Sequence, residues 1–182
     1  MKAQFVYENI KFERGLEPKQ ALSLGRRALI KKWFDDLGYG PEKYTINSDL
    51  SIEVEGSLDL LGTNITSLPD NLSVGRDLWL SGTNITSLPD NLSVGGGLVL
   101  SRTNITSLPD NLSVGGGLNI RETKITSLPD NFSVRGDLHI RGTNITSLPD
   151  NLTIGGNLDL RETKITSLPD NLSVKGKIFK DF

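Results

Sequence analysis

The chain has 182 residues, a formal net charge of −2 and no cysteine. The near-neutral charge argues against a general nucleic-acid binder, and the lack of cysteine excludes disulfides, thiolate metal sites and a cysteine nucleophile. No stretch reaches the roughly 20 apolar residues that a membrane helix needs, and the charged N-terminus has no apolar run of signal-peptide length. These features predict a soluble protein of the cytoplasm, with delivery into a host cell left open.

An N-terminal segment, residues 1–44, precedes the regular part of the sequence. Residues 1–16 show no clean alternation and predict no element. Residues 18–37 predict a helix, because Pro18 suits a first turn and Gly38 is placed to end the helix. The predicted apolar face of this helix consists of Leu22, Leu29, Ile30, Trp33, Phe34 and Leu37.

This helix is expected to cap a stack of coils, with Trp33 and Phe34 covering the first coil. The alternative is a basic amphipathic helix for an anionic membrane or a nucleic acid. The cations that favour this alternative are Arg26, Arg27, Lys31 and Lys32. Asp35 and Asp36 weaken it, because they offset the positive charge. The stretch 44–57 then predicts an irregular first coil.

From Leu58 onward the sequence repeats every 20 residues, which predicts stacked units. The six full repeats begin at Leu58, Leu78, Leu98, Leu118, Leu138 and Leu158, and a truncated seventh begins at Ile178. The apolar side chains of one repeat, about six, contribute roughly 9–18 kcal/mol if buried, whereas ordering its backbone costs roughly 20–40 kcal/mol. One repeat therefore cannot fold alone, and residues 45–182 predict a continuous solenoid.

Each repeat is predicted to contain a strand, a bend, a short return and a second bend. Two leucines two residues apart, such as Leu78 and Leu80, have the spacing of a strand that buries one face. The segment LPDN that follows predicts a turn. Glycine runs such as 95–97 and 115–117 permit backbone angles closed to other residues and let neighbouring coils approach closely.

The pattern L-x-L-x-x-T-x-I-T-S-L-P, from about Leu50 to Phe182, resembles the leucine-rich repeat. The LP motif and the 20-residue length resemble the short bacterial subclass of type III secreted effectors, and similar arrays occur in bacteriophage-encoded proteins. The resemblance implies a leucine-rich-repeat solenoid, mostly β with short irregular returns, behind an N-terminal α-helical cap. Several such effectors carry a ubiquitin-ligase domain with a cysteine nucleophile, and this chain has no cysteine.

The sequence departs from that family at one column, where threonine replaces the usual buried asparagine. The threonines are Thr63, Thr83, Thr103, Thr123, Thr143 and Thr163. We expect their hydroxyls to bond main-chain groups of neighbouring coils. Because a hydroxyl has one donor proton where an amide has two, each rung should have fewer hydrogen bonds than an asparagine rung.

The last stretch, KGKIFKDF, contains no helix comparable to the N-terminal one. Its lysines could discourage strand addition at this edge, and its apolar residues could fold back as a minimal lid. The lysines are Lys175, Lys177 and Lys180, and the apolar residues are Ile178, Phe179 and Phe182. The alternative is an end-to-end homodimer through the exposed last coil.

Variation between the repeats is concentrated at positions that are predicted to point outward from the strands. The column between the two strand leucines reads Asp59, Trp79, Val99, Asn119, His139, Asp159 and Phe179, and the outward column after the pair reads Leu61, Ser81, Ser101, Arg121, Arg141 and Arg161. The segment TSLPDN, by contrast, is identical in all six repeats. The predicted partner-binding residues are therefore Asp59, Trp79, Val99, Asn119, His139, Asp159, Arg121, Arg141 and Arg161.

These candidates also have purely structural interpretations. Trp79 is either a binding anchor or a side chain lying over small neighbours. The three arginines form either a strip for a carboxylate-bearing or phosphate-bearing partner or a solvated face balanced by glutamates. His139, with Asp137 and Asp159 as expected neighbours, lacks the further ligands of a metal site and the nucleophile of a catalytic triad.

The sequence predicts no catalytic constellation, no cofactor and no metal site, so we expect a non-catalytic module rather than an enzyme. Its expected partner is a protein bound through the exposed strand face, as for an effector-like or phage-encoded modulator of a host factor. Two alternatives stay open: a structural protein that self-associates through its C-terminal coil, and a binder of a phosphate-rich ligand. A nucleic acid is not the expected partner, and neither is a membrane.

Overall fold

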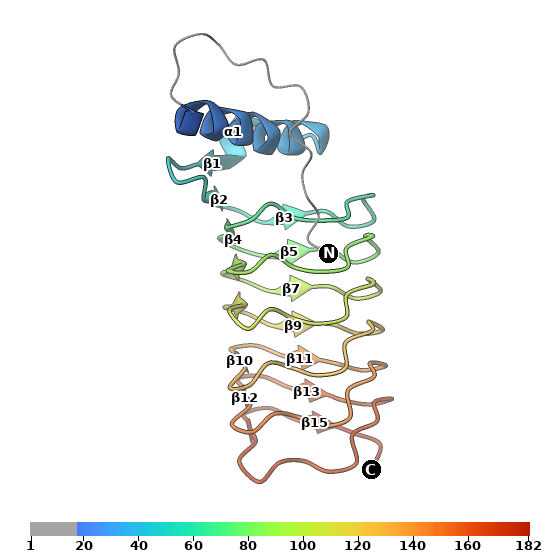
Figure 1. Cartoon of the computed structure of the whole chain (residues 1–182). Helices are drawn as coiled ribbons and strands as arrows, with labels where there is room; N and C mark the ends of the chain where they lie inside the picture. The colour runs from blue at the N-terminus through green and yellow to red at the C-terminus, as the bar shows by residue number, and fades with distance from the viewer. Residues whose placement is uncertain (1–17) are drawn as a thin grey trace.

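The computed structural model describes residues 18–182, so the interpretation of residues 1–16 lies outside the described part of the chain. Helix α1 (Pro18–Asp36) lies across one end of a stack of coils and is followed by the short 3-10 helix η1 (Pro41–Lys43) (Figure 1). The strands of successive coils pair in parallel. The chain is thus a parallel β-solenoid with an N-terminal helical cap, which confirms the predicted architecture.

The first sheet is the one predicted from the paired leucines, and each coil contributes one strand to it. Its strands, in spatial order, are β3 (Leu58–Asp59), β5 (Leu78–Trp79), β7 (Leu98–Val99), β9 (Leu118–Asn119), β11 (Leu138–His139), β13 (Leu158–Asp159) and β15 (Ile178–Phe179). Each residue pairs in register with the residue of the same column in the next coil, as Leu58 does with Leu78. We call the outward surface of this sheet, including the outward residue just after each strand, the strand face.

A second set of strands lies in what the sequence predicted as a short return. One sheet contains β1 (Tyr44–Ile46), β2 (Ile52–Val54), β4 (Leu72–Val74), β6 (Ser93–Val94) and β8 (Ser113–Val114), and another contains β10 (Ser133–Val134), β12 (Thr153–Ile154) and β14 (Ser173–Val174). The signal was present, because Leu72 and Val74 repeat the two-residue spacing of a half-buried strand. The break between these sheets falls at the repeat in which Phe132 replaces leucine and Arg135 replaces glycine.

The irregular first coil contains an antiparallel hairpin of β1 and β2, and β2 pairs in parallel with β4. Strand β1 begins at Tyr44, the last residue of the predicted N-terminal segment 1–44. Beyond it, the apolar columns form one cluster that runs through all the coils, and Leu78, Leu80 and Ile85 are fully buried. In the last coil Leu168 is only partly buried, because no further coil packs on it in the described residues.

The threonine column stabilises the corner of each coil rather than the contact between coils. The hydroxyl of Thr83 donates to the carbonyl oxygen of Leu80 in its own coil at 2.8 Å, and the same bond recurs in all six repeats. The residue before it, Gly82, has a φ of 71° and turns the threonine back over that carbonyl. The expected bonds to neighbouring coils are therefore wrong.

The glycine runs are required by close packing and not by their backbone angles. No residue in 95–97 or 115–117 has a positive φ, so the unusual angles that these runs permit are not used there. The predicted close approach is confirmed, because a β-carbon on Gly116 would lie 2.7 Å from the carbonyl carbon of Gly96. Real β-carbons do not come this close to backbone atoms, so a side chain at position 116 would require the neighbouring backbone to shift.

The cap helix ends as predicted and covers the first coil with an aromatic side chain. The amide of Gly38 (φ 74°) donates to the carbonyl of Asp35 at 3.0 Å, and the amide of Tyr39 donates to that of Phe34 at 2.9 Å. This pair of bonds is the Schellman motif, in which glycine supplies the left-handed residue. Phe34 is fully buried and its ring stacks on Tyr44 with 3.9 Å between centroids, as expected of a cap.

Two polar side chains satisfy the open sheet edges under the cap. The hydroxyl of Tyr39 accepts a hydrogen bond from the amide of Asp59 at 2.8 Å and lies 3.2 Å from its carbonyl oxygen, to which it can donate. The guanidinium of Arg27 donates to the carbonyl oxygens of Ile46 and Asn47 at 2.6 and 2.7 Å. These hydrogen bonds occupy backbone amide and carbonyl groups at the sheet edges that could otherwise pair with another strand.

The apolar face of α1 is narrower than the sequence predicted. Leu22 and Leu29, which were assigned to it, are exposed, and Trp33 is only partly buried. Arg27, one of the cations of the alternative basic helix, contacts the solenoid, because its guanidinium donates to carbonyl oxygens at the end of β1. Helical spacing alone did not reveal that one basic residue belongs to the contact.

Replacing Gly116 with alanine is expected to lower the free energy of unfolding by about 1–3 kcal/mol, because the added methyl group meets the backbone of the preceding coil. Gly56→Ala is the matched control, since nothing lies within 4 Å of the position that its β-carbon would take. Urea denaturation followed by circular dichroism measures both values. Equal effects of the two substitutions would contradict the close-packing role of this glycine column.

Candidate functional site

The structure brings the predicted binding residues together on the strand face. In-register pairing makes the seven outward residues consecutive neighbours along the sheet. They are, in order from the cap, Asp59, Trp79, Val99, Asn119, His139, Asp159 and Phe179. The three arginines of the predicted strip lie two residues after Asn119, His139 and Asp159. Sequence proximity and sheet register therefore define one elongated surface.

Close to the cap, the strand face carries its apolar side chains, next to the hydrogen-bonded serines Ser81 and Ser101. Leu61 is 62% exposed, and Trp79 and Val99 beside it are partly exposed. The carboxylate of Asp59 is exposed, and its Oδ1 accepts a hydrogen bond from the amide of Leu61 at 3.0 Å. Among the described residues, Asp59 makes no ion pair. This half therefore combines exposed apolar groups with one uncompensated negative charge.

Further from the cap, the strand face is an ion-pair network centred on Asp159. Arg161 donates from Nε to Oδ1 at 2.9 Å and from Nη2 to Oδ2 at 3.0 Å. Arg121, two coils earlier, donates to Oδ2 at 2.7 Å. Its Nη2 also lies 3.0 Å from Nδ1 of His139, and since a guanidinium only donates, this nitrogen must be the acceptor.

Asp159 points outward, as its column predicts, yet it is only 1% exposed. The cover comes from Arg121 and Arg161, whose guanidinium groups lie against both carboxylate oxygens. The hydrogen bonds of Arg161, opposed by burial, lower the pKa of Asp159 from 3.8 to about 2. Alternation along a strand predicts that the side chain of Asp159 points outward. It does not predict that side chains of other residues bury it.

The other charges on this half are paired as well. Arg141 binds Glu162 at 2.5 Å, so one glutamate does offset an arginine of the strip as expected. Glu122 instead binds Arg102 at 3.0 Å. His139 lies 3.9 Å from Asp137, and its burial, followed by the charge of Arg121, lowers its pKa. Every arginine of the predicted strip thus has a carboxylate partner in the described part of the chain.

Three of these charged residues occupy a backbone conformation that favours glycine. The column just after the strand face reads Gly62, Gly82, Arg102, Glu122, Gly142 and Glu162, and every member has a φ between 56° and 72°. A side chain there costs about 1 kcal/mol, whereas an exposed ion pair returns about 0.2–1 kcal/mol. The sequence analysis did not include Arg102 among the residues of this surface. The signal was present, because the same column contains Gly62, Gly82 and Gly142.

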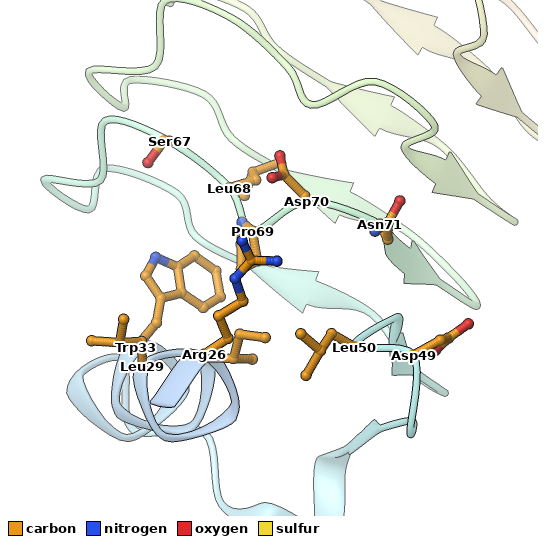
Figure 2. A pocket seen from close by; sticks show the side chains of 11 residues that line it. Arg26, Leu29, Trp33, Asp49, Leu50, Ser67, Leu68, Pro69, Asp70 and Asn71 are labelled. Atoms are coloured by element: carbon orange, nitrogen blue, oxygen red, sulfur yellow. The ribbon is translucent and has the colours of Figure 1, made fainter. Parts of the chain in front are cut away.

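A cavity of about 250 Å³ lies between α1 and the first coil (Figure 2). Its apolar lining comes from Leu29, Ile30, Trp33, Leu50, Leu68 and Pro69, and its polar lining comes from Arg26, Asp49, Ser67, Asp70 and Asn71. The narrow apolar face of α1 leaves this space open. Because small-molecule sites usually measure about 300–1,000 Å³, we regard the strand face as the main candidate.

No protein-family model matches the sequence, and a search of curated proteins gives no match. The leucine-rich-repeat assignment therefore stays a prediction from the repeat pattern. Within residues 18–182, no group of three or more histidine, cysteine, aspartate or glutamate side chains could hold a metal ion. In the same part of the chain, no helix has the length and apolar character to cross a bilayer.

Asp159→Asn is expected to lower the free energy of unfolding at neutral pH by about 2 kcal/mol, because folding depresses the pKa of this carboxyl from 3.8 to about 2. A depressed native pKa means that folding favours the ionised form. Its stabilisation is therefore complete above pH 4 and is lost as the pH falls toward 2. Urea unfolding of both proteins between pH 7 and 2 measures this, and the two stabilities should converge at the acid end.

The control uses a background in which Arg121 and Arg161 are both replaced by glutamine. There the effect of Asp159→Asn should be small at every pH, because the cations that depress the pKa are absent. A difference between wild type and Asp159→Asn that stays constant down to pH 2 would show that the ion pairs do not stabilise the fold.

Proposed function

We propose that this chain is a non-catalytic binding module of the leucine-rich-repeat type that recognises a partner protein through its strand face. The supporting observation is where the repeats differ. Thr86 and Ser87 are exposed, yet they and their equivalents are identical in all six repeats. The strand face is no more exposed, and its outward column nevertheless changes in almost every coil. Freedom from packing alone therefore does not explain the variation, which supports a role of this face in a contact.

The chemistry of the strand face also suits a protein partner. Its apolar half offers Leu61 and Trp79, and its charged half offers Arg141 within a hydrogen-bonded network. Tryptophan and arginine are the side chains most enriched at binding hot spots. An effector-like or phage-encoded modulator of a host factor, acting in a cytoplasm, is the role that the family resemblance implies.

Binding of a phosphate-rich ligand, the other alternative, stays a prediction. A phosphate would have to compete with the carboxylates that already bind Arg121, Arg141 and Arg161. Nothing in the geometry of the strand face favours that competition, because the arginine charges are matched by nearby acids.

Self-association through the last coil is a second candidate, because this coil is open. In the described residues β14 pairs only with β12, and β15 pairs only with β13. The apolar side chains of this coil, Ile178, Phe179 and Phe182, are exposed. A second copy could cover both strand edges and these side chains.

Site-specific cross-linking tests the protein-binding function. A photo-reactive amino acid at Asn119 on the strand face is expected to form one discrete adduct in an extract of the native cell, whereas the same group at Thr106, an exposed position of the unchanging segment, should form none. Excess wild-type protein should remove the adduct. The variant Trp79→Ala Arg141→Ala should compete at least about thirtyfold less well, since hot-spot residues contribute 2 kcal/mol or more.

Mass spectrometry of the adduct identifies the partner, and binding of the purified partner then confirms it. Circular dichroism establishes that the double variant is folded. Equal adducts at Asn119 and Thr106, or full competition by the folded double variant, would show that the strand face is not the binding surface.

Self-association is tested by sedimentation at micromolar concentration. If the last coil pairs with its copy, the wild type should sediment as a dimer and Ile178→Lys should sediment as a monomer. Leu24→Lys is the control, because Leu24 is an exposed apolar residue on the cap helix at the opposite end. A monomeric wild type would rule out this candidate.

A further inference from the structure

At the end of the strand face far from the cap, an aspartate and an aromatic ring together hold a guanidinium. Asp159 pairs in register with Phe179 on the next coil. Arg161 binds both oxygens of Asp159, and its guanidinium carbon lies 5.4 Å from the centre of the Phe179 ring. This arrangement combines a two-point ion pair with a cation–π contact.

The repeat that begins at Leu58, which we call the first full repeat, has the same arrangement without the guanidinium. Asp59 pairs in register with Trp79, in the same two columns. The carboxylates are held alike, because Oδ1 of Asp59 accepts a hydrogen bond from the amide of Leu61 at 3.0 Å, as Oδ1 of Asp159 does from that of Arg161 at 3.4 Å. At the position of Arg161, the first full repeat has Leu61, which supplies no charge.

No cation of the described residues replaces the missing guanidinium. Asp59 is exposed and makes no ion pair there, and the nearby Lys43 lies over the ring of Tyr39, 5.2 Å from its centroid. Tryptophan is the aromatic side chain that binds cations best, so the ring at Trp79 is better suited to this contact than the phenylalanine of the complete arrangement. The carboxylate and the ring are thus both present and both open to a ligand.

We propose that Asp59 and Trp79 bind an arginine side chain of the partner protein, as Asp159 and Phe179 hold Arg161. This inference rests on the proposed function and specifies one contact of it. Arginine is favoured over lysine because the internal example uses a planar group that meets both oxygens and covers a ring. The exposed side chain of Leu61 would pack against the methylene stem of the incoming arginine.

The test uses N-acetyl-arginine amide as the probe and N-acetyl-citrulline amide as its uncharged match. The chain has two tryptophans, so the indole N–H resonance of Trp79 in the full-length protein is assigned by comparison with Trp33→Phe. The arginine probe is expected to shift this resonance with a saturable dependence on concentration, and the citrulline probe is not. Asp59→Asn should weaken the association by roughly fivefold, the value of an exposed ion pair.

A second pair of variants tests the internal comparison directly. Leu61→Arg should supply the guanidinium from within the chain and abolish the response to the arginine probe. Leu61→Gln, which adds length without charge, should retain the response. An arginine probe that leaves the Trp79 indole unmoved, or that acts no better than citrulline, would overturn the proposal, as would an undiminished response in Leu61→Arg.

The outcomes also separate this contact from the proposed function. If the cross-linked partner is captured equally well by wild type and Asp59→Asn, the strand face binds a protein and the arginine contact is wrong. If the arginine probe binds but position 119 captures no partner, the cation site stands and the protein-binding function falls.

Discussion

The backbone hydrogen bonds between successive coils are the constraint on which the other features depend. The amides of Leu78 and Leu80 donate to carbonyl oxygens of the following coil at 2.9 and 2.8 Å, and the pattern recurs along the stack. No coil buries its own core, so the register and the apolar columns repeat along the stack. The outward positions are free of this requirement.

The two halves of the strand face differ in whether their charged side chains are paired. Around Asp159, two arginines cover one carboxylate and bury it, so much of the charge there is committed to holding the coils together. Around Asp59, the carboxylate and Leu61 are exposed, and Trp79 and Val99 are partly exposed. Asp59 is therefore the charge most available to a cation of a partner, although the arginines were the more conspicuous in the sequence.

Periodicity predicted the first sheet and the apolar columns of the core because both depend on spacing alone. It predicted the cap helix together with Pro18 and Gly38, but it placed Leu22 and Leu29 wrongly on the buried face. The same reasoning misplaced the bonds of Thr83, since a hydroxyl can reach its own coil or the next, and the left-handed turn at Gly82 decides between them. The burial of Asp159 was not predictable from alternation, because long side chains from two coils supply the cover. The second sheet was predictable from the spacing of Leu72 and Val74.

A solenoid contains several copies of every position, so each coil is a control for the others. An arginine at position 61 would form the same ion pair with Asp59 that Arg161 forms with Asp159. It would also replace an exposed leucine, so stability alone favours arginine at this position. Among the described residues, the repeat that begins at Leu58 instead leaves the Asp59 carboxylate without an ion pair, next to a tryptophan and a leucine that is 62% exposed. For an isolated chain this arrangement forgoes the roughly 0.2–1 kcal/mol that an exposed ion pair would contribute. In the proposed complex, the arginine of the partner supplies that ion pair and covers the leucine.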